Sequence, residues 1–349
     1  MTDKPVNALK LTAYFAERQR SGGRFLAEAM LDLFAQRNVA ASVMLRGIAG
    51  FGHQRIIRTD QSLTLSEDPS VAIAAVDDPD VIAGLAGDVA AMTGSGLLTL
   101  ERTRMLDDGM TPAPMPGGAV KLTVYLGRNR RYDGAPAYKA LCALLHRHGF
   151  AGVSVLLGVD GTAHGQRRRA HFFGRNVDVP LMVIAIGSAQ QVTAATSELA
   201  AVMDQPMVTV ERVRLGGPPT LPDADSRGRP LWQKLMVFTS EASRHDGLPI
   251  HRALVRRLWE SGASSGVTVL RGIWGFHGDA EPHGDKLIQL GRQVPVATVI
   301  VDTPSNIARS YQIAAALTGR DGLITCETVP ALLAVHDGDS RGGLELADT

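Results

Sequence analysis

The sequence predicts an α+β protein built from three tandem copies of one domain of about a hundred residues. Each copy opens with an apolar strand that starts at a lysine, and each closes with an apolar strand that ends at a glutamate. These residues are Lys10 and Glu101, Lys121 and Glu211, and Lys234 and Glu327. The lysine and the glutamate of a copy lie 91, 90 and 93 residues apart. So constant a separation indicates an internal repeat.

Segments without apolar periodicity separate the copies and set the domain boundaries. Residues 105–119 and 215–231 are rich in Pro, Gly and Asp, so we expect both to be linkers. The tail, residues 331–349, is largely polar and is expected to be flexible. The three domains therefore span residues 8–104, 120–214 and 232–330.

Within each copy the apolar pattern predicts the order β–α–β–β–α–β. The first helix is clearest in the third copy, where Ile250, Leu254 and Leu258 recur at helical spacing and share one face. The second helix is expected to begin near Pro79, Ser188 or Pro304. Buried strands are expected at residues 42–46, 153–157 and 267–271, and again at 71–76, 180–186 and 296–302.

Two split β–α–β units of this kind form a four-stranded antiparallel sheet with both helices on one face, which is the ferredoxin-like fold. The other face of the sheet is too apolar to lie in water, as residues around Thr123 and Tyr125 show. Three such sheets cover one another if they close into a barrel, and a linker of about 15 residues spans roughly 50 Å. We therefore expect a pseudo-trimer within a single chain.

Composition limits the classes of function. The formal net charge of +1 gives no field that gathers nucleic acid, and the predicted central strands lack the aromatic residues with which related folds bind RNA. No apolar run has the length of a membrane span, and the N-terminus lacks the pattern of a signal peptide. Cys142 and Cys326 lie in different copies, which excludes a disulfide framework and indicates a cytoplasmic protein with both thiols packed as small hydrophobes.

Two short motifs recur in the loops. Residues 131–136 and 244–249 share the pattern Arg-x-Asp-Gly-x-Pro, and residues 46–51 and 271–276 share Arg-Gly-Ile-x-Gly-Phe. With the β–α–β–β–α–β order, they resemble the family called domain of unknown function 190, in all three copies. That family looks like a branch of the PII-like superfamily, trimers of ferredoxin-like domains that sense small molecules. The resemblance implies the fold directly, and the function only by analogy.

The resemblance also implies a place for a ligand. PII proteins bind adenine nucleotides in clefts between subunits, at the loop after the second strand and at a Thr-Gly-rich loop before the fourth. Residues 318–322 and 93–96 are similar to that second loop, whereas residues 203–206 have no glycine, and Leu97 and Leu323 replace the lysine of the PII pattern. The ligand-binding candidates are Arg46, Gly47, Gly50, Thr93, Gly94, Gly96, Arg131, Arg244, Arg271, Gly272, Trp274, Gly275, Phe276, Thr318, Gly319, Arg320 and Gly322.

Each of these candidates also has a structural interpretation. Glycines at equivalent positions of the second strand, such as Gly50 and Gly275, suit a tight turn or a bulge. Asp133 and Asp246 are expected to cap the first helix. A loop aromatic such as Trp274 has no core to fill and would stack on a base. The arginines are freer to hold a phosphate or a carboxylate.

A metal site is a weaker prediction. His277 and His283 lie with three carboxylates in a nine-residue loop of the third copy, and could ligate a divalent metal. Their spacing matches no zinc pattern, so we expect a polar loop and name no metal and no cofactor.

We therefore expect a non-enzymatic sensor that binds a small anionic ligand, such as an adenine nucleotide, between domains and signals to a protein partner. No nucleophile with its base recurs across the copies, which argues against an enzyme. A metal-binding protein that resembles the copper-tolerance trimers, and a scaffold that binds only protein, stay open as alternatives. Because the copies have diverged unevenly, one or two clefts are expected to be competent, with the third copy central.

Overall fold

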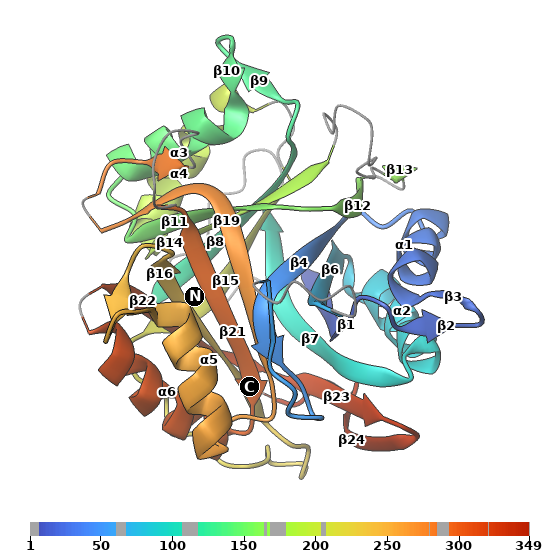
Figure 1. Cartoon of the computed structure of the whole chain (residues 1–349). Coiled ribbons are helices and arrows are strands. Elements are labelled where there is room, and N and C mark those ends of the chain that lie inside the picture. Colours follow the sequence, from blue (N-terminus) through green and yellow to red (C-terminus); the bar gives the residue numbers. More distant parts are fainter. Residues whose placement is uncertain are drawn as a thin grey trace.

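The computed structural model describes residues 7–60, 68–106, 118–163, 166–167, 179–203, 207–278, 280–284, 293–319 and 321–348. Strands form the centre of the molecule and pairs of helices lie on its outside (Figure 1). Within these residues, no helix combines the length and the apolar character that crossing a bilayer requires.

Each copy contains the expected elements, with a short hairpin added before the first helix. The first copy contains β1 (Ala8–Ala16), β2 (Arg20–Ser21), β3 (Arg24–Phe25), α1 (Leu26–Gln36), β4 (Ala41–Phe51), β5 (Arg58–Thr59), β6 (Ser70–Asp77), α2 (Pro79–Met92) and β7 (Ser95–Leu106). The second contains β8 (Ala119–Gly127), β9 (Arg131–Tyr132), β10 (Ala135–Pro136), α3 (Ala137–Arg147), β11 (Gly152–Leu157), β12 (Asp160–Ala163), β13 (Gln166–Arg167), β14 (Pro180–Ser188), α4 (Ala189–Val202) and β15 (Met207–Leu215). The third contains β16 (Trp232–Ser240), β17 (Arg244–His245), β18 (Leu248–Pro249), α5 (Ile250–Ser261), β19 (Val267–His277), β20 (His283–Gly284), β21 (Pro295–Asp302), α6 (Pro304–Thr318) and β22 (Gly322–Val329). The chain ends with β23 (Ala331–His336) and β24 (Asp339–Gly343).

The main strands of each copy pair in the same antiparallel order. In the first copy the order is β4-β6-β1-β7, in the second β11-β14-β8-β15, and in the third β19-β21-β16-β22. The opening strand therefore lies between the third and the closing strand, and the register places Lys10 opposite Glu101. The predictions of a threefold repeat and of its β–α–β–β–α–β order are confirmed.

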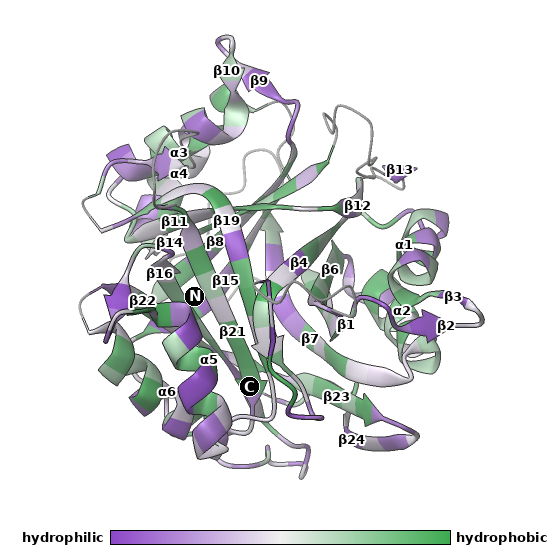
Figure 2. Cartoon of the chain, in the orientation of Figure 1, coloured by the Kyte–Doolittle hydropathy of each residue, from purple (hydrophilic) through white to green (hydrophobic). Residues whose placement is uncertain are grey.

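Four hydrophobic cores hold the molecule together. Three lie under the helices, one in each copy, where the helices cover one face of that copy's strands. The fourth lies between the copies and contains Val43, Met182 and Met236, one from each. Figure 2 shows the same division, because hydrophobic stretches follow the central strands while the outer helices alternate between hydrophobic and hydrophilic. The second face of each sheet is thus buried against the other two copies.

The second strand of each copy continues across the boundary into a neighbour. The end of β4 pairs with the start of β19, the end of β19 pairs with β11, and β12 pairs with the start of β4. The register shifts near Val269 and again near Val155, so the strand bends where it leaves its own sheet. Each copy therefore forms backbone hydrogen bonds with both of the others.

These crossings explain the repeated glycines of the second strand. A Cβ atom at Gly50 or Gly275 would lie well under 3.0 Å from the carbonyl oxygen of Val267 or Val153 on the neighbouring strand. Gly161 approaches the carbonyl oxygen of Ser42 as closely. Close approach of two backbones is sufficient to require glycine at these positions.

The closing strands cross in a similar way. The end of β7 pairs with β15, and the end of β15 pairs with β22. Beyond Pro330 the chain continues as β23, which pairs with β7 of the first copy and turns back as β24. The prediction of a flexible tail is therefore wrong for residues 331–343. The apolar run that begins at Ala331 forms a strand that pairs with the first copy.

The Asp-Gly turns differ from the prediction. Asp133 and Asp246 do not cap helices: both have φ of 48°, and the glycines that follow have φ of 75° and 80°. Two consecutive residues of positive φ form the tight turn of a β-hairpin. The helix N-caps are Pro136 and Pro249, without a side-chain bond. The first copy has the same hairpin, between β2 and β3, with glycines in the turn.

The expected linkers are only partly described. Residues 107–117 of the first lie outside the described residues, and β7 and β8 extend into its two ends. In the second, the Asp225 carboxylate accepts hydrogen bonds from the backbone N–H groups of Arg227, Arg229 and Asp348. This carboxylate holds the second linker and the end of the chain together.

We predict that Gly275→Ala destabilises the protein by about 3 kcal/mol, because the added methyl group must displace the backbone of the neighbouring copy. The matched control is Gly84→Ala on α2, where a Cβ meets no atom within 4 Å. In a helix that change stabilises by about 0.5–1 kcal/mol. Urea unfolding measures both. Equal stability of Gly275→Ala and the wild type would contradict this explanation of the glycine.

Candidate functional site

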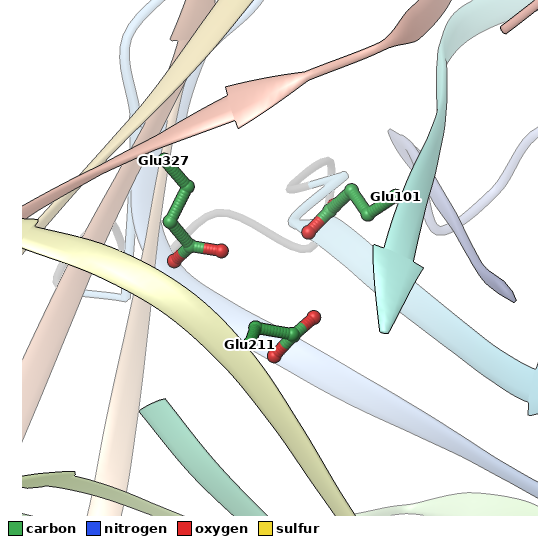
Figure 3. Close-up of side chains that lie close together, drawn as sticks. All are labelled: Glu101, Glu211 and Glu327. Carbon is green, nitrogen blue, oxygen red and sulfur yellow. The ribbon is translucent and has the colours of Figure 1, made fainter. Parts of the chain in front are cut away.

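Six charged side chains meet at the centre of the molecule. The three lysines that open the copies and the three glutamates that close them are each no more than 8% exposed. In every copy the register places the lysine of the opening strand opposite the glutamate of the closing strand. Figure 3 shows the carboxylates of Glu101, Glu211 and Glu327 pointing toward one another from three different strands.

The six groups form a closed ring in which positive and negative charges alternate. Each lysine contacts the glutamate of its own copy and that of one neighbour. The pairs, in order around the ring, are Lys10–Glu211, Glu211–Lys121 (3.1 Å), Lys121–Glu327 (2.5 Å), Glu327–Lys234 (3.3 Å), Lys234–Glu101 and Glu101–Lys10 (2.9 Å). We call this set the charge ring.

In the charge ring, the opposite charges of neighbouring side chains favour the ionised form of one another. Burial alone would raise the pKa of Glu101 and Glu211, but the surrounding ammonium groups outweigh burial and lower both pKa values. Burial opposes the charge of Lys10 and Lys234 as well, and there the carboxylates outweigh it and raise the pKa. For Lys121 burial dominates and lowers the pKa. With all six ionised, the net charge of the ring is zero.

The three carboxylates of the charge ring could be taken for a metal centre. One carboxylate oxygen of each lies within 4.8 Å of the other two. Among the described residues, no other three Asp, Glu, His or Cys side chains come as close together. However, three ammonium groups lie between them and already neutralise them. A divalent ion would leave a net charge of +2 in a buried place, so the ring suits a structural role.

A small hollow, open to solvent on one side, lies between the second and third copies. Strands of both copies form its walls, and it contains Gly275 and Phe276 of the predicted loop. The lining residues are Gly152, Val153, Ser154, Ile184 and Ile186 from the second copy, and Phe238, Thr239, Ser240, Gly275, Phe276, His277, His283, Pro295 and Leu323 from the third.

The hollow offers neutral polar atoms. The hydroxyl oxygen of Thr239 and Nδ1 of His277 are buried and have no hydrogen-bond partner. Burial lowers the pKa of His277, against a weaker opposite effect of Asp321, so the imidazole is neutral at pH 7. Within the described part of the chain, the residues that line the hollow include no lysine and no arginine.

The predicted arginines lie outside this lining. Arg46 donates to Glu17 at 2.9 Å, and Arg271 donates to Asp60 at 2.8 Å and to Glu241 at 2.7 Å. Arg131 and Arg244 bond backbone carbonyl oxygens of their own hairpin segments, those of Gly134 at 3.4 Å and Glu241 at 2.7 Å. Arg320 lies outside the described residues. Arg46 and Arg271 therefore have carboxylate partners within the protein.

The predicted Thr-Gly loops are packed differently at their two ends. The hydroxyl groups of Thr93 and Thr318 donate to the carbonyl oxygens of Val89 and Ala314, within their own helices. A Cβ at Gly319 would meet no atom within 4 Å, and a Cβ at Gly94 would meet the Gln19 side chain at 3.9 Å. A Cβ at Gly96 or Gly322 would lie 2.8 Å from a neighbouring atom. The third-copy loop reaches the hollow through the adjoining Leu323.

The two aromatic residues of the third-copy motif have a core to fill, contrary to expectation. Trp274 lies edge-on to Tyr138 at 6.4 Å between ring centroids, and the ammonium group of Lys139 lies 4.2 Å from its ring centroid. Phe276 is 4% exposed and belongs to the hydrophobic core of the second copy. Both rings pack on a neighbouring domain, which sequence position alone does not indicate. Gly47 and Gly272 also lie close to atoms of a neighbouring strand.

Different side-chain contacts lie at the other two boundaries. Between the first copy and the tail, the rings of His53 and His336 stack at 4.4 Å between centroids. Between the first and second copies, Arg167 forms ion pairs with Asp160 at 2.6 Å and with Asp32. The three boundaries are therefore not equivalent.

Sequence reasoning missed two parts of this arrangement. The first is the charge ring: its lysines and glutamates defined the repeat, but their contacts with one another were not predicted. A charged residue inside an apolar strand is a signal that it has a partner of opposite charge. Thr239 and Ser154, which line the hollow, carried no signal because each lies in an ordinary β-strand.

The repeated units match one family model three times, over residues 8–105, 119–215 and 232–331. The chain belongs to the family domain of unknown function 190 (DUF190), described as "Uncharacterized ACR". Among solved structures, an unknown protein from Galdieria sulphuraria is 9% identical, with 61% of this chain and 97% of that chain covered and a TM-score of 0.18. So low a score carries no argument about the fold.

We predict that Lys121→Met destabilises the protein by about 3–5 kcal/mol, because it leaves buried carboxylates without compensation. Adding Glu327→Gln restores a neutral ring and should recover part of the loss. Urea unfolding of the three proteins measures the effect. A Lys121→Met variant as stable as the wild type would show that the charge ring does not constrain the fold.

We also predict a pH effect from His251 on α5, which is 1% exposed and whose pKa burial, Arg252 and Arg271 lower to about 4. Because the unfolded chain binds this proton near pH 6.5 and the folded chain only near pH 4, stability falls as the pH drops between these values. The loss is about 3 kcal/mol by pH 4. The measurement is the free energy of unfolding in urea at pH 7 and at pH 4, for the wild type and for His251→Gln. The wild type should lose more stability between the two pH values than the variant does. Parallel losses in the two proteins would contradict it.

Proposed function

We propose that this protein is a non-enzymatic, PII-like sensor in which three ferredoxin-like domains close into a pseudo-trimer within one chain. It binds a small anionic ligand, such as an adenine nucleotide, between domains and passes the signal to a protein partner. The common strand order of the copies and the burial of their second sheet faces against one another support the architecture.

One observation carries the functional proposal: the hollow lies at a boundary between copies and borders two predicted ligand segments. Gly275 and Phe276 of the second-strand motif line it, and Leu323 connects it to the Thr-Gly loop of the third copy. Apolar walls with a few polar atoms are typical of small-molecule sites.

The anionic part of the ligand is assigned to the mouth of the hollow. Among the predicted arginines, Arg271 is the one with a connection to the lining. It donates a hydrogen bond to Glu241, which follows the lining residue Ser240 in the chain. A phosphate or carboxylate would replace Glu241 or Asp60 as the partner of this guanidinium. Displacing an internal carboxylate would free an acidic side chain of the first or third copy, which is a means of transmitting the signal.

The proposal assigns no catalytic residue. Burial raises the pKa of the Cys326 thiol to about 12 and that of Cys142 as well, so neither thiol is a nucleophile at neutral pH. The side chains that line the hollow are suited to binding.

We predict that the full chain binds ATP in metal-free buffer, and that Gly152→Val weakens binding at least ten-fold. A Cβ at Gly152 meets no atom closer than 3.4 Å, so the valine fits the strand while its methyl groups enter the hollow. Arg271→Ala should also weaken binding. Isothermal titration calorimetry with ATP, ADP and AMP measures the affinities.

The matched control is Arg46→Ala, which removes the equivalent arginine of the first copy and should leave binding unchanged. Absence of nucleotide binding would contradict the proposal of a nucleotide ligand. Binding that is equally strong in Gly152→Val would place the ligand elsewhere.

A further inference from the structure

Two histidines line the hollow between the second and third copies. Strands β19 and β20 pair with Gly275 opposite His283 and Trp274 opposite Gly284. Because side chains alternate along a strand, His277 lies on the same face as Gly275, so His283 is its diagonal neighbour. Gly275 has no side chain to separate them, and both histidines line the hollow.

Each of the two histidines has one ring nitrogen that could bind a metal ion. Nδ1 of His283 lies 2.8 Å from the carbonyl oxygen of Glu281, which can only accept, so Nδ1 donates this bond and Nε2 is the nitrogen left for another partner. Nδ1 of His277 is buried without a partner. It faces Gly152, where a Cβ would lie 3.5 Å away, so the absence of a side chain leaves room beside it. A carbonyl that fixes one nitrogen of a histidine is typical of metal ligands.

The surroundings of the two histidines offer further polar groups that suit a hydrated cation. Thr239 is 4% exposed, and its hydroxyl oxygen has no partner. Ser154 is also 4% exposed and lines the same hollow. These hydroxyls can bond water molecules on a metal ion. Among the described residues that line the hollow there is no lysine or arginine, and the negative charge of Asp321 acts on His277.

We propose that the hollow binds one divalent transition-metal ion through His277 and His283, with water completing the coordination. Neutral imidazoles suit Zn²⁺, Cu²⁺ and Ni²⁺, whereas Mg²⁺ prefers oxygen ligands. The proposal goes beyond the sensor function, because it requires neither an anionic ligand nor the arginines. It also differs from the three glutamates of the charge ring, whose charges are already compensated.

The test is a titration of metal-free full-length protein with ZnCl₂, without nucleotide, by isothermal titration calorimetry. The expected result is one Zn²⁺ per chain, with affinity about 100-fold weaker in His277→Ala and in His283→Ala. MgCl₂ should give no binding. Thermal unfolding with and without ZnCl₂ should show a stabilisation in the wild type that both variants lose.

The matched control is His336→Ala, which removes one ring of the His53–His336 pair, two imidazoles that approach closely outside the hollow. It must retain the zinc affinity of the wild type. Absence of zinc binding, or unchanged binding in His277→Ala, would overturn the proposal. Neither result bears on ATP binding, which is measured in metal-free buffer, so the two proposals fail separately.

Discussion

The charge ring is the constraint on which the rest of the structure depends. Its six side chains come from six different strands, two in each copy, and every charge has a partner from its own copy and one from a neighbour. Pulling one copy away would leave buried charges without partners, which costs several kcal/mol for each broken pair. Any other register of the closing strands would also separate the glutamates from the lysines. The ring therefore specifies both that the copies close and how they align.

The ring is supported by backbone pairing and by a shared core. The second strands cross between copies at glycines such as Gly50 and Gly275, where two backbones approach more closely than a side chain allows. The inner faces of the three sheets then bury one another. These features recur at all three boundaries, whereas the residues around the clefts do not. A fused chain can vary one boundary at a time. Here one boundary has the His53–His336 pair, one has the Arg167–Asp32 ion pair, and the third has the hollow.

The sequence predicted those features that depend on local pattern or on comparison of the copies. Repeat length, element order and the positions of the main strands followed from apolar periodicity and from self-similarity. Features that depend on a neighbour were missed: the meeting of Lys10 with Glu211, the packing of Trp274 on α3, and the strand formed by Ala331–His336. The prediction that the Asp-Gly segments cap helices was wrong for a different reason. Asp before Gly suits both a helix cap and a hairpin turn, and the backbone angles show that these residues form hairpin turns.

The candidate site could be located from sequence only as a set of loops. Gly275 and Phe276 were correctly included and do line the hollow, but the polar atoms that give it chemical character belong to Thr239 and His277, on two different strands. A cavity between domains is a property of their relative placement, and no motif in one copy encodes it. His277 and His283 illustrate this, because their spacing matches no zinc pattern while both line the hollow from paired strands.

Small-angle X-ray scattering of the full chain tests most directly whether the charge ring closes the three copies onto one another. A closed chain of 349 residues has a radius of gyration of about 20 Å, the value for a single compact domain of that length. We expect that value at neutral pH, for a monomer. A radius of gyration of about 30 Å or more would mean three domains separated on linkers, and would contradict the closed arrangement.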